Sequence, residues 1–246
     1  MVHLGCATWR LPKTLQPDFP GEGTHLARYA ARLPAVELNS SFYRRHRRSL
    51  YEKWASEVPE GFRFCVKLPR GLTHDQRLRS TEGLEQFLGE TAGLGGKLGA
   101  ILVQLPPSLT FEAKPAAHFL EQLRAGFGGR IICEPRHASW FADEAEALLK
   151  EQGVSRAAVD PPPADGAENP GGDPDCVYLR LHGSPRRFYS AYSEAFLEDL
   201  ANKLREYAEH SETWCIFNNT ASDAGLANAM TLLGTLDDFA PGVGGR

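Results

Sequence analysis

The sequence predicts a single α/β domain of the TIM-type (β/α)8 barrel class over residues 1–246. Short β-like runs alternate with helical patterns about eight times, and this alternation implies parallel strands joined by crossovers. A length of 246 residues suits one such barrel, since the class typically needs about 250. The first strand–helix turn carries no GxGxxG motif, which argues against the main alternative, an open doubly wound sheet.

Eight apolar runs are the predicted strands. They cover residues 3–9, 35–40, 63–69, 99–106, 130–137, 155–160, 176–183 and 213–220. The helical patterns between and after them are "HLARYAARL", "SLYEKWASEV", "EGLEQFLGETAGL", "AAHFLEQLRAGF", "EAEALLKEQG", "SEAFLEDLANKLREYAEH" and "AGLANAMTLLGTL". The sixth pattern places Phe196, Leu200 and Leu204 on one amphipathic stripe. After the sixth strand, residues 161–175 are rich in Pro and Gly, which predicts a helix-free loop there.

The composition is that of an ordinary globular protein. The net charge of -4 gives no general attraction to nucleic acid or to an anionic membrane. No apolar run approaches the roughly 20 residues that span a bilayer, and the first ten residues lack a signal-peptide pattern. The five cysteines are odd in number, widely spaced and placed in apolar runs, which predicts unpaired core thiols and a cytoplasmic location.

Polar residues interrupt the apolar strands near their carboxyl ends. Side chains on a strand alternate between two faces, so Glu134 and Arg136 share one face, opposite Ile131 and Cys133. In a barrel the polar face points to the interior, and barrel enzymes build their sites at the carboxyl ends of the strands. The catalytic candidates are Glu37, Lys67, Glu134, Asp160 and His182. The substrate-binding candidates are Asn39, His74, Gln104, Arg136, His137, Arg180, Asn218 and Asn219.

A structural role for these charges is the alternative. The inward set holds three acids and three strong bases, whose charges cancel in a possible ion-pair network. Burying each ion costs several kcal/mol in desolvation, about as much as the pairing returns. Six such charges at one mouth of a barrel are hard to explain by stability alone, and we therefore favour a functional site.

The ordered motifs resemble a known family. The blocks are "GCATW", "VELNSSFYR", "GFRFCVKLPRGLTH", "LGAILVQLPPS", "CEPRHASW", "YLRLHG" and "FNNT". Together they cover nearly the whole chain and resemble the YecE-like family, also called domain of unknown function 72. The resemblance implies a TIM-type barrel and assigns no reaction. One departure is Thr8, which stands where the family usually has a glycine.

The residue types at the mouth favour a small anionic ligand that bears phosphate or carboxylate. Arg136 and Arg180 suit bidentate oxyanion binding, and Lys67 supplies a point charge. The acids are candidate general bases, and the histidines are candidate proton shuttles. No serine lies in a GxSxG elbow. We predict an enzyme of the hydrolase, lyase or isomerase type that needs no cofactor.

Three other functions stay open, as does the oligomeric state. A divalent-metal enzyme would use Glu37, Glu134, Asp160 and His182 as ligands. A nucleic-acid-binding protein would use the basic loop "YRRHRR" at 43–48, with nearby aromatic side chains for stacking. A non-catalytic anion sensor would bind the same ligand without turnover. The three cations weaken the metal hypothesis, and the acidic net charge weakens the nucleic-acid hypothesis.

Overall fold

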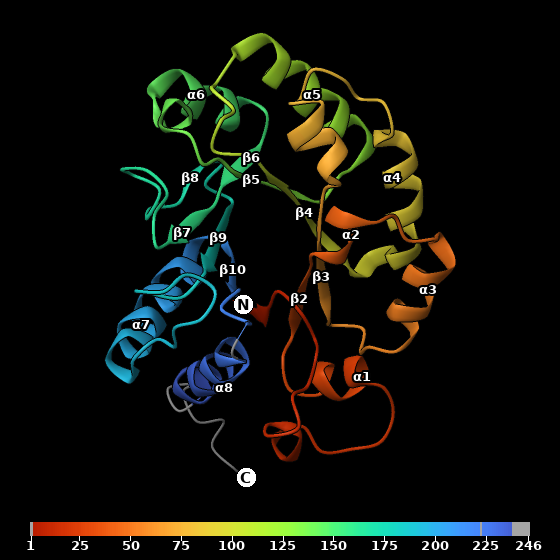
Figure 1. Cartoon of the computed structure of the whole chain (residues 1–246), viewed down its shortest axis with the longest axis vertical. Coiled ribbons are helices and arrows are strands. Elements are labelled where there is room, and N and C mark those ends of the chain that lie inside the picture. The colour runs from red at the N-terminus through yellow and green to blue at the C-terminus, as the bar shows by residue number, and fades with distance from the viewer. Residues whose placement is uncertain (1, 222, 238–246) are drawn as a thin grey trace.

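The fold is a nearly closed, mostly parallel, barrel-like sheet surrounded by helices (Figure 1). The computed structural model describes residues 2–221 and 223–237. The strands are β1 (Val2–Cys6), β2 (Ala35–Leu38), β3 (Arg63–Lys67), β4 (Leu98–Gln104), β5 (Arg130–Glu134), β6 (Val154–Arg156), β7 (Ala158–Asp160), β8 (Gly171–Gly172), β9 (Cys176–Leu181) and β10 (Glu212–Phe217). Every neighbouring pair is parallel except β6 and β8.

The strand order leaves the sheet nearly closed, with β7 and β8 at its two ends. The eighth predicted strand, β10, pairs in parallel with β1. The sixth predicted strand is divided at Ala157 into β6, which pairs with β5, and β7, which pairs with β9. The Ala157 N–H still donates to the Cys133 carbonyl at 2.9 Å, so the backbone stays bonded across the division. This division and the short β8, which was not predicted, give the described residues ten strands where the sequence predicted eight.

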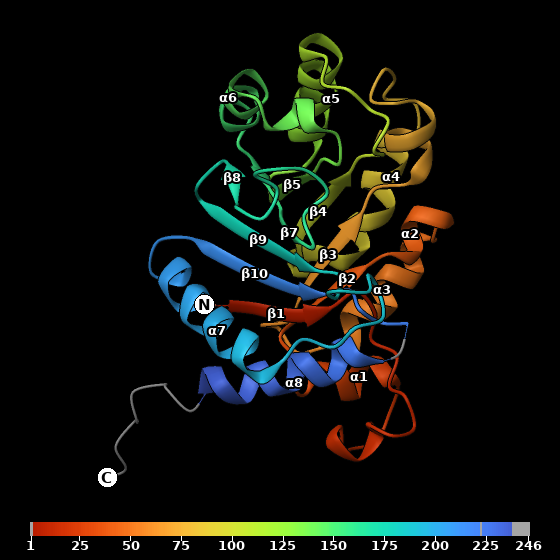
Figure 2. The same cartoon turned by 60° about the vertical axis from the view of Figure 1, so that its left-hand side comes forward.

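Helices cover the outside of the sheet (Figures 1 and 2). They are α1 (His25–Ala30), α2 (Ser40–Tyr43), α3 (Arg48–Ser56), α4 (Leu84–Thr91), α5 (Ala113–Gly126), α6 (Asp143–Glu151), α7 (Glu194–His210) and α8 (Ala224–Asp237). Short helical turns are η1 (Gln16–Asp18), η2 (Gly71–Asp75), η3 (Ala92–Lys97) and η4 (Ala138–Phe141). Ser193 begins α7 as its N-cap, because its hydroxyl accepts the Phe196 N–H.

The alternation of side chains creates two packed layers. Outward residues such as Val36 and Val66 pack in the larger core, together with residues of the helices. Inward residues such as Leu102, Ile132 and Trp214 form a second buried cluster inside the sheet. All five cysteines are buried and unpaired, as predicted. The predicted alternation of the fifth strand is thus confirmed, because Ile132 lies in the inner cluster and Ile131 and Cys133 lie in the larger core.

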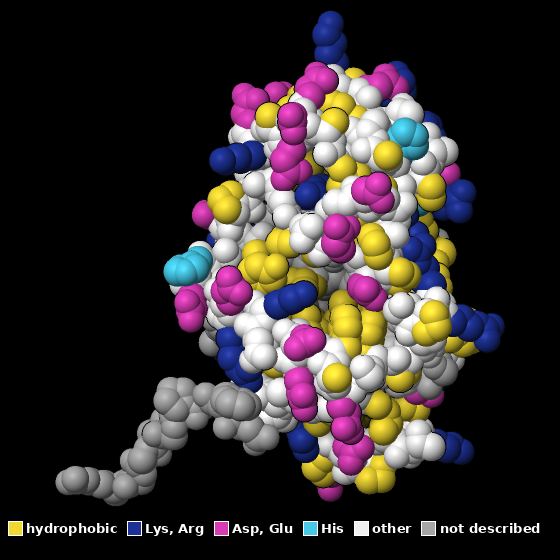
Figure 3. All heavy atoms as spheres, turned by 90° about the vertical axis from the view of Figure 1, so that its left-hand side faces the viewer, with side chains coloured by type: hydrophobic (Ala, Val, Ile, Leu, Met, Phe, Trp, Pro, Cys, Tyr) yellow, Lys and Arg dark blue, Asp and Glu magenta, His cyan; other side chains and the backbone are white. Residues whose placement is uncertain are grey.

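One side of the sheet lacks a covering helix. Residues 161–175 form the predicted helix-free loop, with β8 as its one short strand. Gly172 is required there, since it has φ +68° and an added Cβ would meet the Val154 carbonyl at 2.2 Å. The surface on this side is hollowed and partly hydrophobic (Figure 3). A cavity of about 190 Å³ lies there, lined by Leu179, Leu181 and Leu200 among others.

No helix among the described residues is long and apolar enough to cross a bilayer.

Candidate functional site

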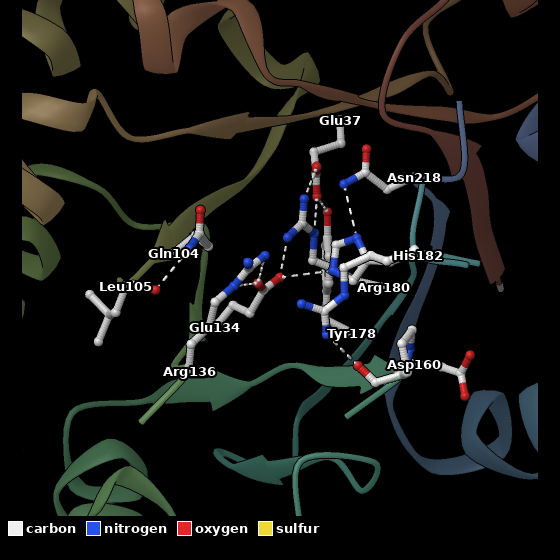
Figure 4. A network of polar contacts seen from close by, with 12 residues as sticks. Glu37, Gln104, Leu105, Glu134, Arg136, Asp160, Tyr178, Arg180, His182 and Asn218 are labelled. Carbon is white, nitrogen blue, oxygen red and sulfur yellow. Dashed lines mark hydrogen bonds and ion pairs between the residues drawn. The ribbon is translucent and has the colours of Figure 1, made fainter. Parts of the chain in front are cut away.

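A buried ion network occupies the interior at the carboxyl end of the strands (Figure 4). Arg180 of β9 lies at its centre, and its side chain is 1% exposed. Its Nε and Nη2 donate to the Glu37 carboxylate at 2.9 and 2.6 Å, and its Nη1 donates to Glu134. The Tyr178 hydroxyl also donates to Glu37 at 2.9 Å. One guanidinium thus joins two carboxylates from different strands.

Both carboxylates are ionised and engaged. Burial, the largest single influence, raises the pKa of Glu37 and of Glu134, but Arg180 together with the other hydrogen-bond donors and cations around each carboxylate outweighs it, so that both pKa values are lowered. Arg136 adds a second guanidinium to Glu134, with Nη2 at 2.8 Å and Nε at 2.9 Å from Oε1. A carboxylate held in this way is a weak general base. The geometry therefore favours a binding role for Glu37 and Glu134 over the predicted catalytic one.

Lys67 differs from the two arginines. Its ammonium lies 3.9 Å from the centroid of the Phe42 ring, a cation–π contact. Within the described part of the chain, no carboxylate oxygen lies within 4 Å of it. Burial, followed by repulsion from Arg180, lowers the pKa of Lys67 to about 8. Three cations therefore face two carboxylates, and the cation without a carboxylate partner is Lys67.

His182 and two asparagines border the network. The Asn218 amide nitrogen lies 3.0 Å from His182 Nδ1. If that amide donates, the ring proton is on Nε2, which lies 3.8 Å from Glu134 Oε2. Burial lowers the pKa of His182, so the imidazole is neutral near pH 7. Asn39 Nδ2 donates to Glu37 at 2.9 Å, while its Oδ1 is buried and has no hydrogen-bond partner among the described residues.

These groups surround a cavity of about 340 Å³. Its lining combines cations, amides and two aromatic side chains. The lining residues are Ala7, Asn39, Tyr43, Lys67, Arg136, Arg180, Phe188, Asn218 and Thr220. His74 lies beside this cavity, because its ring packs edge-on against Phe42 at 4.9 Å. Burial, together with nearby Lys67, lowers the pKa of His74 to about 4, so it too is neutral.

Asp160 does not join the site. Val159 belongs to the inner cluster, so the next side chain points outward. The Asp160 carboxylate instead accepts the Tyr192 hydroxyl at 2.7 Å, and Figure 4 shows it turned away from the network. Only its backbone carbonyl reaches the site, where it accepts the His182 N–H at 2.7 Å. The predicted catalytic role of Asp160 does not fit this placement.

Three other predicted binding residues bond elsewhere. Gln104 is inward, and its amide donates to the Leu105 carbonyl at 2.8 Å, the contact drawn for it in Figure 4. His137 caps η4, since its Nδ1 accepts the Ser139 N–H. Asn219 is buried and donates to the Ser190 carbonyl at 2.9 Å. These side chains support loops and turns around the mouth and do not line the cavity.

The ligand set of the metal alternative is not assembled. Among the described residues, no three His, Cys, Asp or Glu side chains come together as metal ligands would. The outward direction of Asp160 removes one predicted ligand, and the arginines occupy the two glutamates.

The basic loop of the nucleic-acid alternative is engaged in part within the protein. Arg45 pairs with Glu90, and Arg48 pairs with Glu52 at 3.0 Å. His46 is buried, and its ring packs edge-on against Trp54 at 5.2 Å. These ion pairs engage two of the loop's four arginines.

The predicted set of catalytic and binding residues left out three contributors to the site. Tyr178 shares the inward face of Arg180, so its alternation could have indicated its contact with Glu37. Phe42 lies beneath the Lys67 ammonium, and Phe188 lines the cavity from the loop after β9. No periodic signal marks either phenylalanine, because each sits on an irregular segment or a single helical turn.

Fold and site together define an α/β protein with a barrel-like sheet and a buried charge network at its carboxyl-end mouth. The family model described as "protein of unknown function DUF72" matches residues 3–242. The chain belongs to this family, as the motifs indicated.

Relatives and solved structures agree with this. The UPF0759 protein YecE of Escherichia coli is 30% identical over 174 residues, which are 68% of this chain and 62% of that protein. This match thus spans about three fifths of the relative. The UPF0759 protein YunF of Bacillus subtilis is 26% identical over 96% of this chain and 95% of its own. A DUF72 family crystal structure from Thermotoga maritima has a TM-score of 0.77 and 25% identity, covering 96% of this chain and 99% of that one. One from Enterococcus faecalis has a TM-score of 0.77 and 24% identity, with 96% and 98% covered.

Proposed function

We propose that this protein is an enzyme that performs general acid/base chemistry on a small anionic substrate at the mouth of the sheet. One observation carries the proposal. The Lys67 ammonium lines a cavity beside Arg136 and Arg180, and within the described residues it has no carboxylate partner. An unbalanced, partly desolvated cation attracts a phosphate or carboxylate strongly, because little water screens it.

Each lining group then has a role. Lys67 and Arg136 bind the anion, and Lys67 also exchanges a proton, since a pKa of about 8 suits transfer near neutral pH. Asn39 Oδ1 accepts a hydrogen bond from a substrate hydroxyl, which would satisfy a buried acceptor that lacks a partner among the described residues. Asn218 and neutral His182 orient the reacting group. The reaction classes are hydrolysis, elimination and isomerisation.

The same proposal assigns the sheet to the TIM-type (β/α)8 class, as one domain. Its support is the pairing of β10 with β1 and the single residue between β6 and β7. The predicted range 1–246 includes residues 1, 222 and 238–246, which lie outside the described residues.

Sulfate binding, measured by isothermal titration calorimetry, tests the site. The charge of sulfate does not change across this pH range, so any change in affinity reports on the titration of the protein. Wild-type protein should bind sulfate, and affinity should fall as pH rises through about 8, where Lys67 loses its proton. Lys67→Met should lose binding. Lys97→Met is the matched control, because Lys97 bonds the Ala55 and Val58 carbonyls far from the cavity. Sulfate binding that survives Lys67→Met would contradict the proposal.

Turnover separates an enzyme from an anion sensor. Wild-type protein should convert at least one compound in a panel of phosphorylated and carboxylated metabolites, and activity should persist in EDTA, since arginines occupy the glutamates. Binding without turnover would favour the sensor.

A further inference from the structure

Two exposed aromatic side chains line the same cavity as the cations. Tyr43 ends α2 and is 81% exposed, and Phe188 lies in the loop after β9 and is 39% exposed. With neighbouring Tyr189, they are the exposed large hydrophobic residues of the described chain. Aromatic side chains usually bury most of their surface. Their exposure beside an unbalanced cation therefore calls for a ligand that covers them.

The backbone holds Phe188 in an unfavourable conformation. Its φ of +70° lies in the left-handed region, which bulky residues rarely adopt and which costs about 1 kcal/mol or more. Its N–H donates to the His182 carbonyl at 2.5 Å, and its carbonyl accepts the Ala221 N–H at 3.0 Å. Its ring packs edge-on against His182 at 5.5 Å. This loop thus fixes an exposed ring at the wall of the cavity, where packing alone gains little.

Tyr43 connects the aromatic rim to the cation. Its ring packs edge-on against Phe42 at 5.0 Å, and Phe42 carries the Lys67 ammonium on its face. A ring bound beside Tyr43 would therefore lie next to an anion bound at Lys67. The cavity volume of about 340 Å³ is at the low end of small-molecule sites, about 300–1,000 Å³, and exceeds the need of a bare oxyanion.

We propose that the mouth binds a monophosphate ester that carries a planar aromatic ring, such as an aryl phosphate or a nucleotide. The phosphate binds at Lys67 and Arg136, and the ring stacks against Tyr43 and Phe188. This inference rests on the proposed function, because it uses the same cations for the anion. It adds the chemical class of the group that is attached to that anion.

Calorimetry with three probes tests the proposal: inorganic phosphate, glycerol phosphate and phenyl phosphate. Wild-type protein should bind phenyl phosphate roughly tenfold more tightly than glycerol phosphate, because stacking a ring on aromatic side chains is worth about this much. Tyr43→Ala combined with Phe188→Leu should remove that advantage, so that phenyl phosphate loses more affinity than glycerol phosphate does. Leucine retains a β-carbon, so the strain at position 188 stays similar. Tyr189→Leu, which changes an exposed ring outside the cavity lining, should retain the advantage.

Tyr43→Ala alone is tested as well, in case the double variant misfolds. The Tyr43 side chain is 81% exposed and contributes little packing, so this single variant should fold. It should lower the advantage of phenyl phosphate by at least threefold. Equal binding of phenyl and glycerol phosphates, both dependent on Lys67, would overturn the aromatic class and leave the anion site standing. If none of the three probes bound wild-type protein, both the aromatic ligand class and the anion site would be overturned.

Discussion

The ion pairs at the two ends of the barrel-like sheet differ in their exposure to solvent. At the amino-terminal end, Arg130 pairs with Glu212 at 2.9 Å, and the two side chains are 33% and 31% exposed. At the carboxyl end, Arg180 pairs with Glu37 and Glu134, and these side chains are at most 1% exposed. Water therefore screens the first pair, whereas the second network depends on its own geometry.

The difference supports the proposal that the functional site lies at the carboxyl end. Exposed ion pairs contribute up to about 1 kcal/mol and need no further explanation. Buried ionic networks are often no more stabilising than apolar residues of the same volume, and this one also leaves Lys67 without a carboxylate partner among the described residues. Stability alone would not select that arrangement, whereas anion binding would.

The largest expected effect follows from Arg180→Met. The change leaves Glu37 without a guanidinium and Glu134 with one instead of two. We expect the free energy of unfolding to fall by about 3–5 kcal/mol at pH 7, the usual cost of leaving a buried charge unpaired. Urea denaturation measures it.

The triple variant Glu37→Gln, Arg180→Met, Glu134→Gln is the control for this prediction. It removes Arg180 and both carboxylates at similar volume and should recover most of the loss, because Arg136, which is left without Glu134, is 18% exposed and keeps its contact with water. A triple variant as unstable as Arg180→Met would show that packing, rather than unpaired charge, sets the cost.

Acid should weaken the same network. The folded-state pKa values of Glu37 and Glu134 lie below the ordinary value of 4.5. The unfolded chain therefore binds protons first, and the stability from these groups is complete above about pH 4.5 and lost as pH falls below it. Urea midpoints at pH 7, 5, 4 and 3 should fall more steeply for wild type than for the triple variant. Parallel curves would mean that other groups control acid unfolding.

Strand alternation made much of this network predictable. Glu37, Lys67, Glu134 and Arg180 occupy strands with clear apolar alternation, so their inward direction could be read from the sequence. Asp160 was wrongly predicted to point inward, because its strand "SRAAVD" consists largely of small residues with no clear apolar alternation. The pairing partner also changes within this strand, at Ala157.

The strand ends were harder to predict than the strands. The predicted strand 130–137 ends at Glu134, and the predicted strand 176–183 ends at Leu181. The polar residues that follow Glu134 and Leu181 lie outside the sheet, so the directions of their side chains depend on tertiary contacts. Phe188 shows the limit, because a left-handed residue in a loop has no periodic signal in the sequence.

A smaller effect of opposite sign is expected for Lys67→Met. The folded-state pKa of Lys67 is about 8, below its ordinary 10.5, so folding disfavours its charged form below pH 8. We expect the substitution to raise the free energy of unfolding by roughly 0.5–2 kcal/mol at pH 7, as removal of a functional group often does. The gain should shrink as pH rises from 8 towards 10.5, where the unfolded lysine also becomes neutral.

Lys97→Met is the matched control in the same urea experiments. Lys97 donates to two carbonyls at 2.8 Å, so its loss should destabilise the protein. If Lys67→Met also destabilised it at pH 7, the ammonium of Lys67 would be a structural group.

The smallest effect is expected at the amino-terminal end, for Arg130→Met. Glu212 would keep its hydrogen bond from Trp214 Nε1 at 2.9 Å and its access to water, so no charge would be stranded. We expect a loss of less than about 1 kcal/mol, mostly abolished in 1 M salt, where screening already weakens the pair. Urea denaturation of Arg130→Met and of Arg180→Met, each at low and at high salt, measures the two losses. A salt-independent loss as large as that of Arg180→Met would mean that solvent exposure does not distinguish the two ends. The functional interpretation of the carboxyl end would then lose its energetic support.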